Sequence, residues 1–392
     1  MNEPQKKNEL HQKPDSRHVP ALDGVRGVAI AMVVAFHSGL ILDSSSLGEK
    51  AWLKVASIGW AGVDLFFVLS GFLITTILIQ TRDEPRYFRN FFMRRVLRIF
   101  PLYFGSLLLL FSQLDDRGQQ MWYWLFAQNW ISVFEGLTPA QPLALQPYWS
   151  LAVEEQFYLV WPLVICLLRP RQIPLFCVLT SLVALTARCV AKSQGVEVWT
   201  VMTVTPFRLD ALALGGLVAS CRLSEQRTRL TKFAPFVLAG CLVALIVIGF
   251  VEGGFHGDRI SSQTIGYSLF ALMCAALIAM VVEEHPLAKL PRRLLEWEPL
   301  RHLGNRSYCI YVVHMPVLVF MRSVYVRRLQ EKDTGTSDVQ AFIFAVATCL
   351  ILAELSWHLY EKQFLKLKRR FPRGDEPVAE ADSNATVSAN TQ

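Results

Sequence analysis

Charged residues are scarce in this sequence of 392 residues: they make up 18% of it, against about 25% in soluble domains. Hydrophobic residues make up 53%, and the mean hydropathy is +0.33. Long runs without charge exclude a single soluble domain and favour a chain that crosses a membrane. No basic patch interleaved with aromatics stands apart from these runs, so the net charge of +7 does not indicate nucleic-acid binding.

Cysteine patterns and processing signals are also missing. None of the eight cysteines forms a CxxC pair, and none lies in a predicted outer loop. We therefore predict no disulfide, no metal site and no permanently bound cofactor. The first apolar run is too long for a cleaved signal peptide and has no small-residue cleavage site after it. No repeat is evident, and we expect no fused soluble domain.

The apolar runs predict an all-α, polytopic membrane bundle of about ten spans. The approximate spans are 21–42, 58–79, 99–114, 148–168, 173–191, 200–221, 233–251, 264–283, 304–326 and 339–360. With the N-terminus inside, the inner segments hold 28 of the 39 lysines and arginines and the outer segments hold 9. This asymmetry predicts that both termini are cytoplasmic.

Polar ends flank one predicted membrane domain, residues 20–365. Residues 1–19 and 366–392 are polar, and we expect them to be disordered cytoplasmic tails. The segment 82–98 mixes aromatics with arginines and predicts an interfacial helix that leads into the third span. The aromatic stretch 121–134 suits the outer interface or the mouth of a cavity.

The first span, LDGVRGVAIAMVVAFH, carries two unusual residues. Arg26 and His37 are 11 residues apart, close to three helical turns, so they share one face about 16 Å apart. His37 then lies near mid-membrane, where ionisable groups usually face a bundle interior or a water-filled cavity. Structural roles are open too: a neutral His37 bonded to a neighbouring helix, and an Arg26 that anchors the interface.

The second span, GVDLFFVLSGFLITT, contains Asp64 and a group of small residues. Gly62, Ser70 and Gly71 allow helices to approach closely, and packing is the favoured role of the glycines. Asp64 is a candidate site residue or a helix cap.

An arginine pair follows in MRRVLRIFPLY. Arg95 and Arg98 are three residues apart and share a helix face, and guanidinium groups bind phosphate through several hydrogen bonds. By spacing alone, anchoring to anionic lipid headgroups is the stronger interpretation.

The fourth span opens with PYWSLAVEEQFYLVWPL. Glu154 and Glu155 lie about two turns inside it and point about 100° apart, so we expect at most one to face a given cavity. Such a glutamate can handle protons. Tyr148 suits an interfacial belt.

Later spans add further ionisable groups. In TPFRLDALALGG, Arg208 and Asp210 are predicted to pair inside the membrane. In LGNRSYCIYVVHMPV, His314 lies about ten residues from the inner helix end, near the predicted depth of His37. Together these groups indicate a polar cavity that opens to an anionic ligand from the cytoplasm.

These motifs, in this order, resemble the acyltransferase family 3 integral membrane proteins, a group that includes bacterial O-antigen and exopolysaccharide acetylases. The resemblance covers about residues 18–365. It rests on Arg26-x10-His37, on GVDLFFVLSGFLIT, on the arginine pair in RRVLRIFPLY, on WSLAVEEQFYLVWP, and on FRLDALALG with LGNRSYCIYVVHMPV. In the ninth span this chain has VVHMPV, where many members have an aromatic residue beside the histidine.

The resemblance implies transfer of an acyl group, most often acetyl, from cytoplasmic acyl-CoA to a hydroxyl of a carbohydrate or glycolipid in the bacterial inner membrane or beyond it. Some members carry a fused extracytoplasmic hydrolase-like domain, and we expect a stand-alone transferase here. The acceptor, the acyl chain and the oligomeric state stay open.

The resemblance and the helix geometry together suggest roles for individual residues. Arg95 and Arg98, with Arg26, would hold the CoA phosphates, and His37 would act as general base or transient acyl carrier. Glu154 would orient the imidazole or relay its proton. The remaining candidates, as acceptor-binding residues, are Asp64, Ser70, Tyr148, Glu155, Arg208, Asp210, Tyr308 and His314.

Two other function classes fit part of the pattern. A secondary transporter for an anionic or sugar-linked substrate also needs intramembrane charges, although the chain shows no matching interrupted helices in two halves. A membrane scaffold without catalytic activity leaves the deep histidines unexplained.

Overall fold

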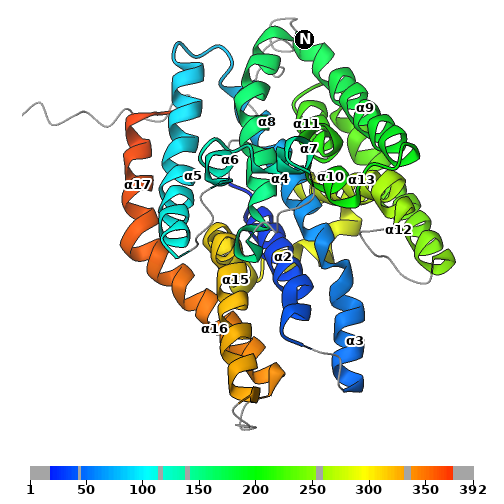
Figure 1. The fold of residues 1–392 in the computed structure, drawn as a ribbon. Coiled ribbons are helices and arrows are strands. Elements are labelled where there is room, and N and C mark those ends of the chain that lie inside the picture. Colours follow the sequence, from blue (N-terminus) through cyan, green and yellow to red (C-terminus); the bar gives the residue numbers. More distant parts are fainter. Residues whose placement is uncertain are drawn as a thin grey trace, which may run out of the picture.

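The computed structural model describes residues 18–42, 46–113, 118–136, 142–252, 259–330 and 337–373, without the side chains of 327–330. Throughout these ranges the regular structure is helical, as expected (Figure 1). The longer helices are α2 (Pro20–Phe36), α3 (Leu47–Ala56), α4 (Ala61–Gln80), α5 (Tyr87–Phe111), α8 (Tyr148–Leu167), α9 (Ile173–Ser193), α11 (Leu209–Arg222), α12 (Arg227–Val251), α13 (Tyr267–Val282), α15 (Glu298–Gln330) and α16 (Asp338–Ser356).

Eight helical segments of the described chain are long and apolar enough to cross a membrane. They match all the predicted spans except the third and the sixth. The third corresponds to α5, a helix of 25 residues whose first half is rich in arginine, and the sixth to α11, which has 14 residues. The chain is an integral membrane protein, and the count of ten spans and the side of the termini stay predictions.

Two pairs of helices pack backbone against backbone at the centre of the bundle. A Cβ atom added at Gly71 of α4 would lie 1.9 Å from the carbonyl oxygen of Leu212, and one at Gly215 of α11 would lie 2.0 Å from that of Val68. Helix α15 meets α2 in the same way, because a Cβ at Gly304 would lie 1.8 Å from the carbonyl oxygen of Asp23. The packing role expected for Gly71 is confirmed.

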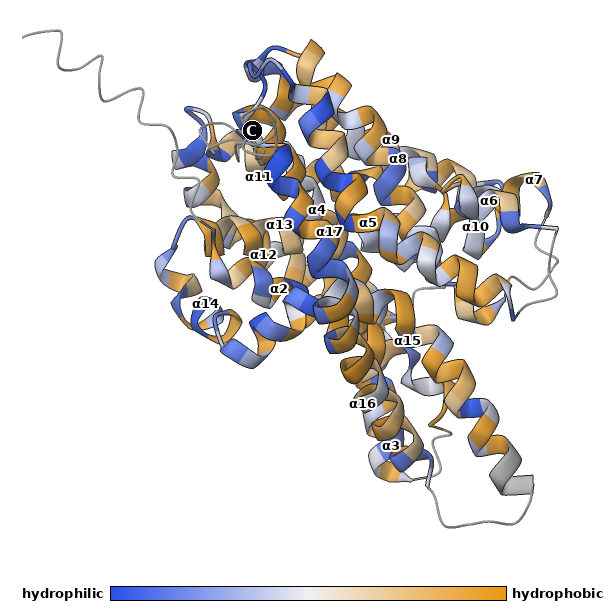
Figure 2. Cartoon of the chain, turned by 90° about the vertical axis from the view of Figure 1, so that its left-hand side faces the viewer, coloured by the Kyte–Doolittle hydropathy of each residue, from blue (hydrophilic) through white to orange (hydrophobic). Residues whose placement is uncertain are grey.

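Outer helices turn apolar side chains away from the bundle. Only 17% of the apolar stretch of α12 is buried, and Phe250 at its end is 88% exposed. Hydrophobic residues make up much of the length of the long helices (Figure 2). Outward-facing apolar side chains are what a membrane helix presents to lipid.

The aromatic stretch 121–134 folds back onto the bundle. Its backbone reverses at Phe126, which has a φ of 52°, and the Phe126 ring stacks on Tyr103 of α5 at 4.1 Å between centroids. The buried Tyr103 hydroxyl donates to the carbonyl of Tyr123. Part of this stretch is therefore interior packing instead of an outer belt.

The C-terminal part stays helical beyond the predicted domain boundary at residue 365. Helix α17 (Lys362–Lys366) continues into η11 (Leu367–Arg370), and α17 lies beside α5 (Figure 1). Residues 366–373, which we expected to belong to a disordered tail, thus have a defined place, while 374–392 and 1–17 lie outside the described residues.

We predict that Gly71→Ala lowers the free energy of unfolding by about 1–3 kcal/mol, because the added methyl overpacks a backbone contact. Thermal unfolding in detergent measures this effect. Gly240→Ala on α12 is the control, since no atom lies within 4 Å of its added Cβ. Equal melting temperatures for both variants would contradict the close helix contact.

Candidate functional site

A cavity of about 390 Å³ lies among α2, α4, α5, α8 and α15. Two residues that follow α17, Lys368 and Arg373, also line it. Six basic side chains and two carboxyl groups line it. The basic residues are Arg26, Arg94, Arg95, Arg98, Lys368 and Arg373. The predicted polar cavity is present, and it has a strong excess of positive charge.

Of the five arginines that line the cavity, three come from α5, one comes from α2, and Arg373 follows η11 (Leu367–Arg370). Arg95 and Arg98 share a face of α5, as their spacing predicted. The buried Nε of Arg95 has no hydrogen-bond partner among the described residues. Arg26 comes from α2 and pairs with Asp23 at 2.9 Å. The sequence-predicted phosphate-binding residues are thus brought together around one space.

Both glutamates of α8 line the cavity, so the expectation that at most one would face it is wrong. The α8 residues that line the cavity form one stripe along the helix, and this stripe is wide enough to include two side chains about 100° apart. The buried Glu155 Oε1 has no hydrogen-bond partner within the described structure. Ser70 of α4 and Tyr158 of α8 share a hydrogen bond of 2.6 Å in the same wall.

The two predicted intramembrane histidines lie side by side. The rings of His37 and His314 are 5.1 Å apart between centroids. Each Nδ1 contacts a backbone carbonyl, Val33 at 2.9 Å and Tyr311 at 2.7 Å. A carbonyl only accepts hydrogen bonds, so each Nδ1 carries a hydrogen, and in the neutral form of the ring Nε2 is then the basic atom.

Tyr311 connects this histidine pair to the cavity. Its ring centroid is 5.6 Å from that of His314, and its hydroxyl lies 2.5 Å from Ser150 Oγ. Tyr311 and Ser150 line the cavity, whereas His37 and His314 do not. His314 is fully buried, and its Nε2 has no partner among the described residues.

Sequence reasoning missed Tyr311, Ser150 and Tyr158 as site residues. Tyr311 precedes His314 by three positions and so shares its helix face, a signal that was available in the motif. Ser150 and Tyr158 lie on α8 on either side of the glutamate pair. Tyr308, which was predicted, does line the cavity, and its hydroxyl donates to the carbonyl of Ile99 at 2.8 Å.

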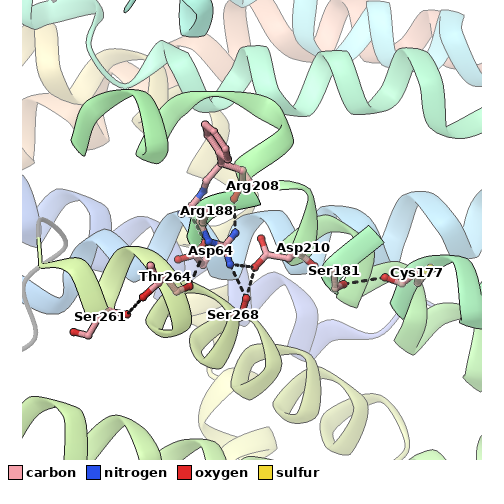
Figure 3. A network of polar contacts seen from close by, with 10 residues as sticks. Asp64, Cys177, Ser181, Arg188, Arg208, Asp210, Ser261, Thr264 and Ser268 are labelled. Atoms are coloured by element: carbon pink, nitrogen blue, oxygen red, sulfur yellow. Dashed lines mark hydrogen bonds and ion pairs between the residues drawn. The ribbon is translucent and has the colours of Figure 1, made fainter. Parts of the chain in front are cut away.

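Arg208 and Asp210 do not pair with each other, which corrects our prediction. Arg208 precedes the first residue of α11, and Asp210 lies in its first turn, so each side chain meets a partner from another helix. Arg208 instead contacts Asp64 of α4, and Asp210 accepts from Arg188 of α9 at 2.7 Å (Figure 3). Ser268 completes the network through its own bond to Asp210.

Asp64, Arg208 and Asp210 belong to this ion-pair network, and none of the three lines the cavity. The Arg208 guanidinium also lies 4.1 Å from the ring centroid of Tyr267. Tyr148 is likewise outside the lining and fully buried, with its hydroxyl donating to Ser106 at 2.9 Å. It is an interior residue and not part of an interfacial belt.

Comparison with known proteins finds one matching family model and several relatives of similar sequence. A family model described as an acyltransferase domain matches residues 19–354. The YrhL protein of Bacillus subtilis is 31% identical over 383 residues, which is 90% of this chain and 56% of that protein. The O-acetyltransferase OatA of Staphylococcus aureus is 28% identical over 386 residues, 91% of this chain and 59% of OatA.

A peptidoglycan O-acetyltransferase, OatA of Listeria monocytogenes, is similar at 27% identity over 374 residues, covering 89% of this chain and 56% of that protein. The chain thus spans little more than half the length of these relatives. No solved structure matches it.

We predict that Asp64→Ala lowers the free energy of unfolding by about 3–5 kcal/mol, because it leaves the buried Arg208 charge without its partner. Thermal unfolding in detergent tests this. Glu296→Ala, which breaks a half-exposed pair with Arg292, is the control and should cost about 0–1 kcal/mol. An Asp64→Ala protein of unchanged stability but low activity would indicate a substrate-binding role instead.

Proposed function

We propose a function from one premise: this chain belongs to the acyltransferase family whose domain model matches residues 19–354. The proposed activity is O-acyl transfer in a bacterial cytoplasmic membrane, from acyl-CoA to a hydroxyl group of a cell-wall glycan. Acetyl is the acyl group, since relatives of this chain are named O-acetyltransferases. The name of the Listeria relative supports peptidoglycan as the class of acceptor.

The observation that carries this proposal is the basic cavity leading to the histidine pair. Coenzyme A bears several phosphates at one end and its thioester at the other. Arginines bind phosphate through planar groups of N–H donors. The six basic side chains suit the phosphates, and the pantetheine arm then extends toward Tyr311 and the histidines beyond it.

In the proposed reaction, Nε2 of His37 takes the proton of the acceptor hydroxyl as the oxygen attacks the thioester carbonyl. The new ester bond forms, the carbon–sulfur bond breaks, and the thiolate of CoA takes up the proton. The bond from Nδ1 to the Val33 carbonyl holds the ring in the required tautomer. His314 lies beside His37, and proton relay is the role we propose for the two glutamates of the cavity wall.

The cytoplasmic position of the donor is part of the proposal. The basic end of the cavity is built from Arg26 and from the arginine-rich start of α5, segments that the charge asymmetry assigns to the inner face. The acceptor would approach the histidines from the opposite side.

The transporter hypothesis has less support. The intramembrane charges that suggested it are paired within the protein, Asp64 with Arg208 and Asp210 with Arg188. Consumption of acyl-CoA separates the two functions, since a transporter moves its solute unmodified.

We predict that His37→Ala lowers kcat at least about 100-fold, the contribution expected of a general base. The assay is CoA release from acetyl-CoA by the purified protein in lipid nanodiscs, with soluble peptidoglycan fragments as acceptor. His358→Ala is the matched control, because this histidine is 61% exposed and lies outside the cavity lining. Full activity in a folded His37→Ala protein would refute the proposed role.

A further inference from the structure

The basic wall of the cavity includes a segment that the family model does not reach. Lys368 and Arg373 line the cavity, while the matched residues end at 354. We call residues 367–373 the C-terminal segment. Its contribution to the cavity was not visible from the motifs, because the segment lies beyond all of them.

Helix α5 holds the C-terminal segment in place. The Asn90 side chain donates to the carbonyl of Pro372 at 2.9 Å, and Arg94 donates to that of Phe371 at 2.8 Å. The guanidinium of Arg89 lies 5.5 Å from the centroid of the Phe371 ring. These contacts fix the segment against the same helix that carries Arg95 and Arg98.

Basic groups outnumber carboxyl groups in the lining of the cavity, and this excess favours an anionic ligand. Two carboxyl groups face six basic groups, and like charges in a partly enclosed space repel one another more strongly than in water. A ligand with several negative charges relieves this repulsion. Lys368 and Arg373 line the same cavity as the arginine pair, and α5 holds their segment in place, so the segment adds basic groups to the site from outside the matched domain.

We propose that Lys368 and Arg373 bind the phosphate-bearing end of the acyl-CoA donor, which makes the C-terminal segment a determinant of donor affinity. This inference rests on the proposed function. An anionic lipid headgroup presents the same phosphate chemistry, and the experiment separates the two sources.

The test compares Lys368→Ala/Arg373→Ala with Arg369→Ala/Arg370→Ala in phosphatidylcholine nanodiscs. The control variant removes two cations from exposed positions of the same segment that do not line the cavity. We expect the first variant to bind acetyl-CoA about 10- to 100-fold more weakly, at tenfold for each 1.4 kcal/mol lost, with KM raised and kcat kept. Turnover of S-acetylpantetheine, which lacks the nucleotide phosphates, should be unchanged.

Asn90→Ala provides a second measurement, because it loosens the C-terminal segment without removing a charge. It should weaken acetyl-CoA binding by a smaller factor and leave S-acetylpantetheine turnover unchanged.

Wild-type affinity for acetyl-CoA in the Lys368→Ala/Arg373→Ala variant would overturn the inference and leave the proposed function standing. No acetyl-CoA binding by the folded wild type would overturn both. Weaker binding of phosphatidylglycerol alone would assign the segment to lipid and overturn the inference.

Discussion

A charge among apolar membrane helices is costly unless a partner of opposite sign meets it, and this requirement sorts the polar interior of the protein into two regions. In one region each carboxylate meets an arginine from another helix, as Asp64 meets Arg208 and Asp210 meets Arg188. In the other region basic groups outnumber carboxyl groups around a cavity. In the first region the opposite charges are paired within the protein, and in the second the lining residues carry an excess of basic groups, for which we propose an anionic ligand.

Helix packing places these regions relative to the histidines. Glycines let α2 and α15 meet at their backbones; His314 lies on α15, and its neighbour His37 follows α2 directly, at the start of η2 (His37–Leu40). A second glycine contact joins α4 to α11, and Arg208, next to the start of α11, reaches Asp64 of α4. Because both contacts are backbone to backbone, they leave little freedom in how the polar side chains are presented.

Tyr311 joins the cavity to the histidine pair. Its hydroxyl contacts Ser150 within the cavity wall, and its ring faces His314. A donor in the cavity and an acceptor at the histidines would therefore meet around this side chain. The C-terminal segment contributes Lys368 and Arg373 to the lining, and α5 holds it through Asn90 and Arg94.

The sequence by itself determined the helical class, most of the membrane spans and several of the residues that line the cavity, because apolar runs and helical spacing are local properties. Arg26, Arg95 and Arg98 were found in this way, and so was the depth shared by His37 and His314. Only the tertiary structure decided which charges pair, that both Glu154 and Glu155 face the cavity, and that Lys368 and Arg373 belong to it. These features depend on contacts between helices far apart in the chain, and spacing along one helix carries no information about its neighbours.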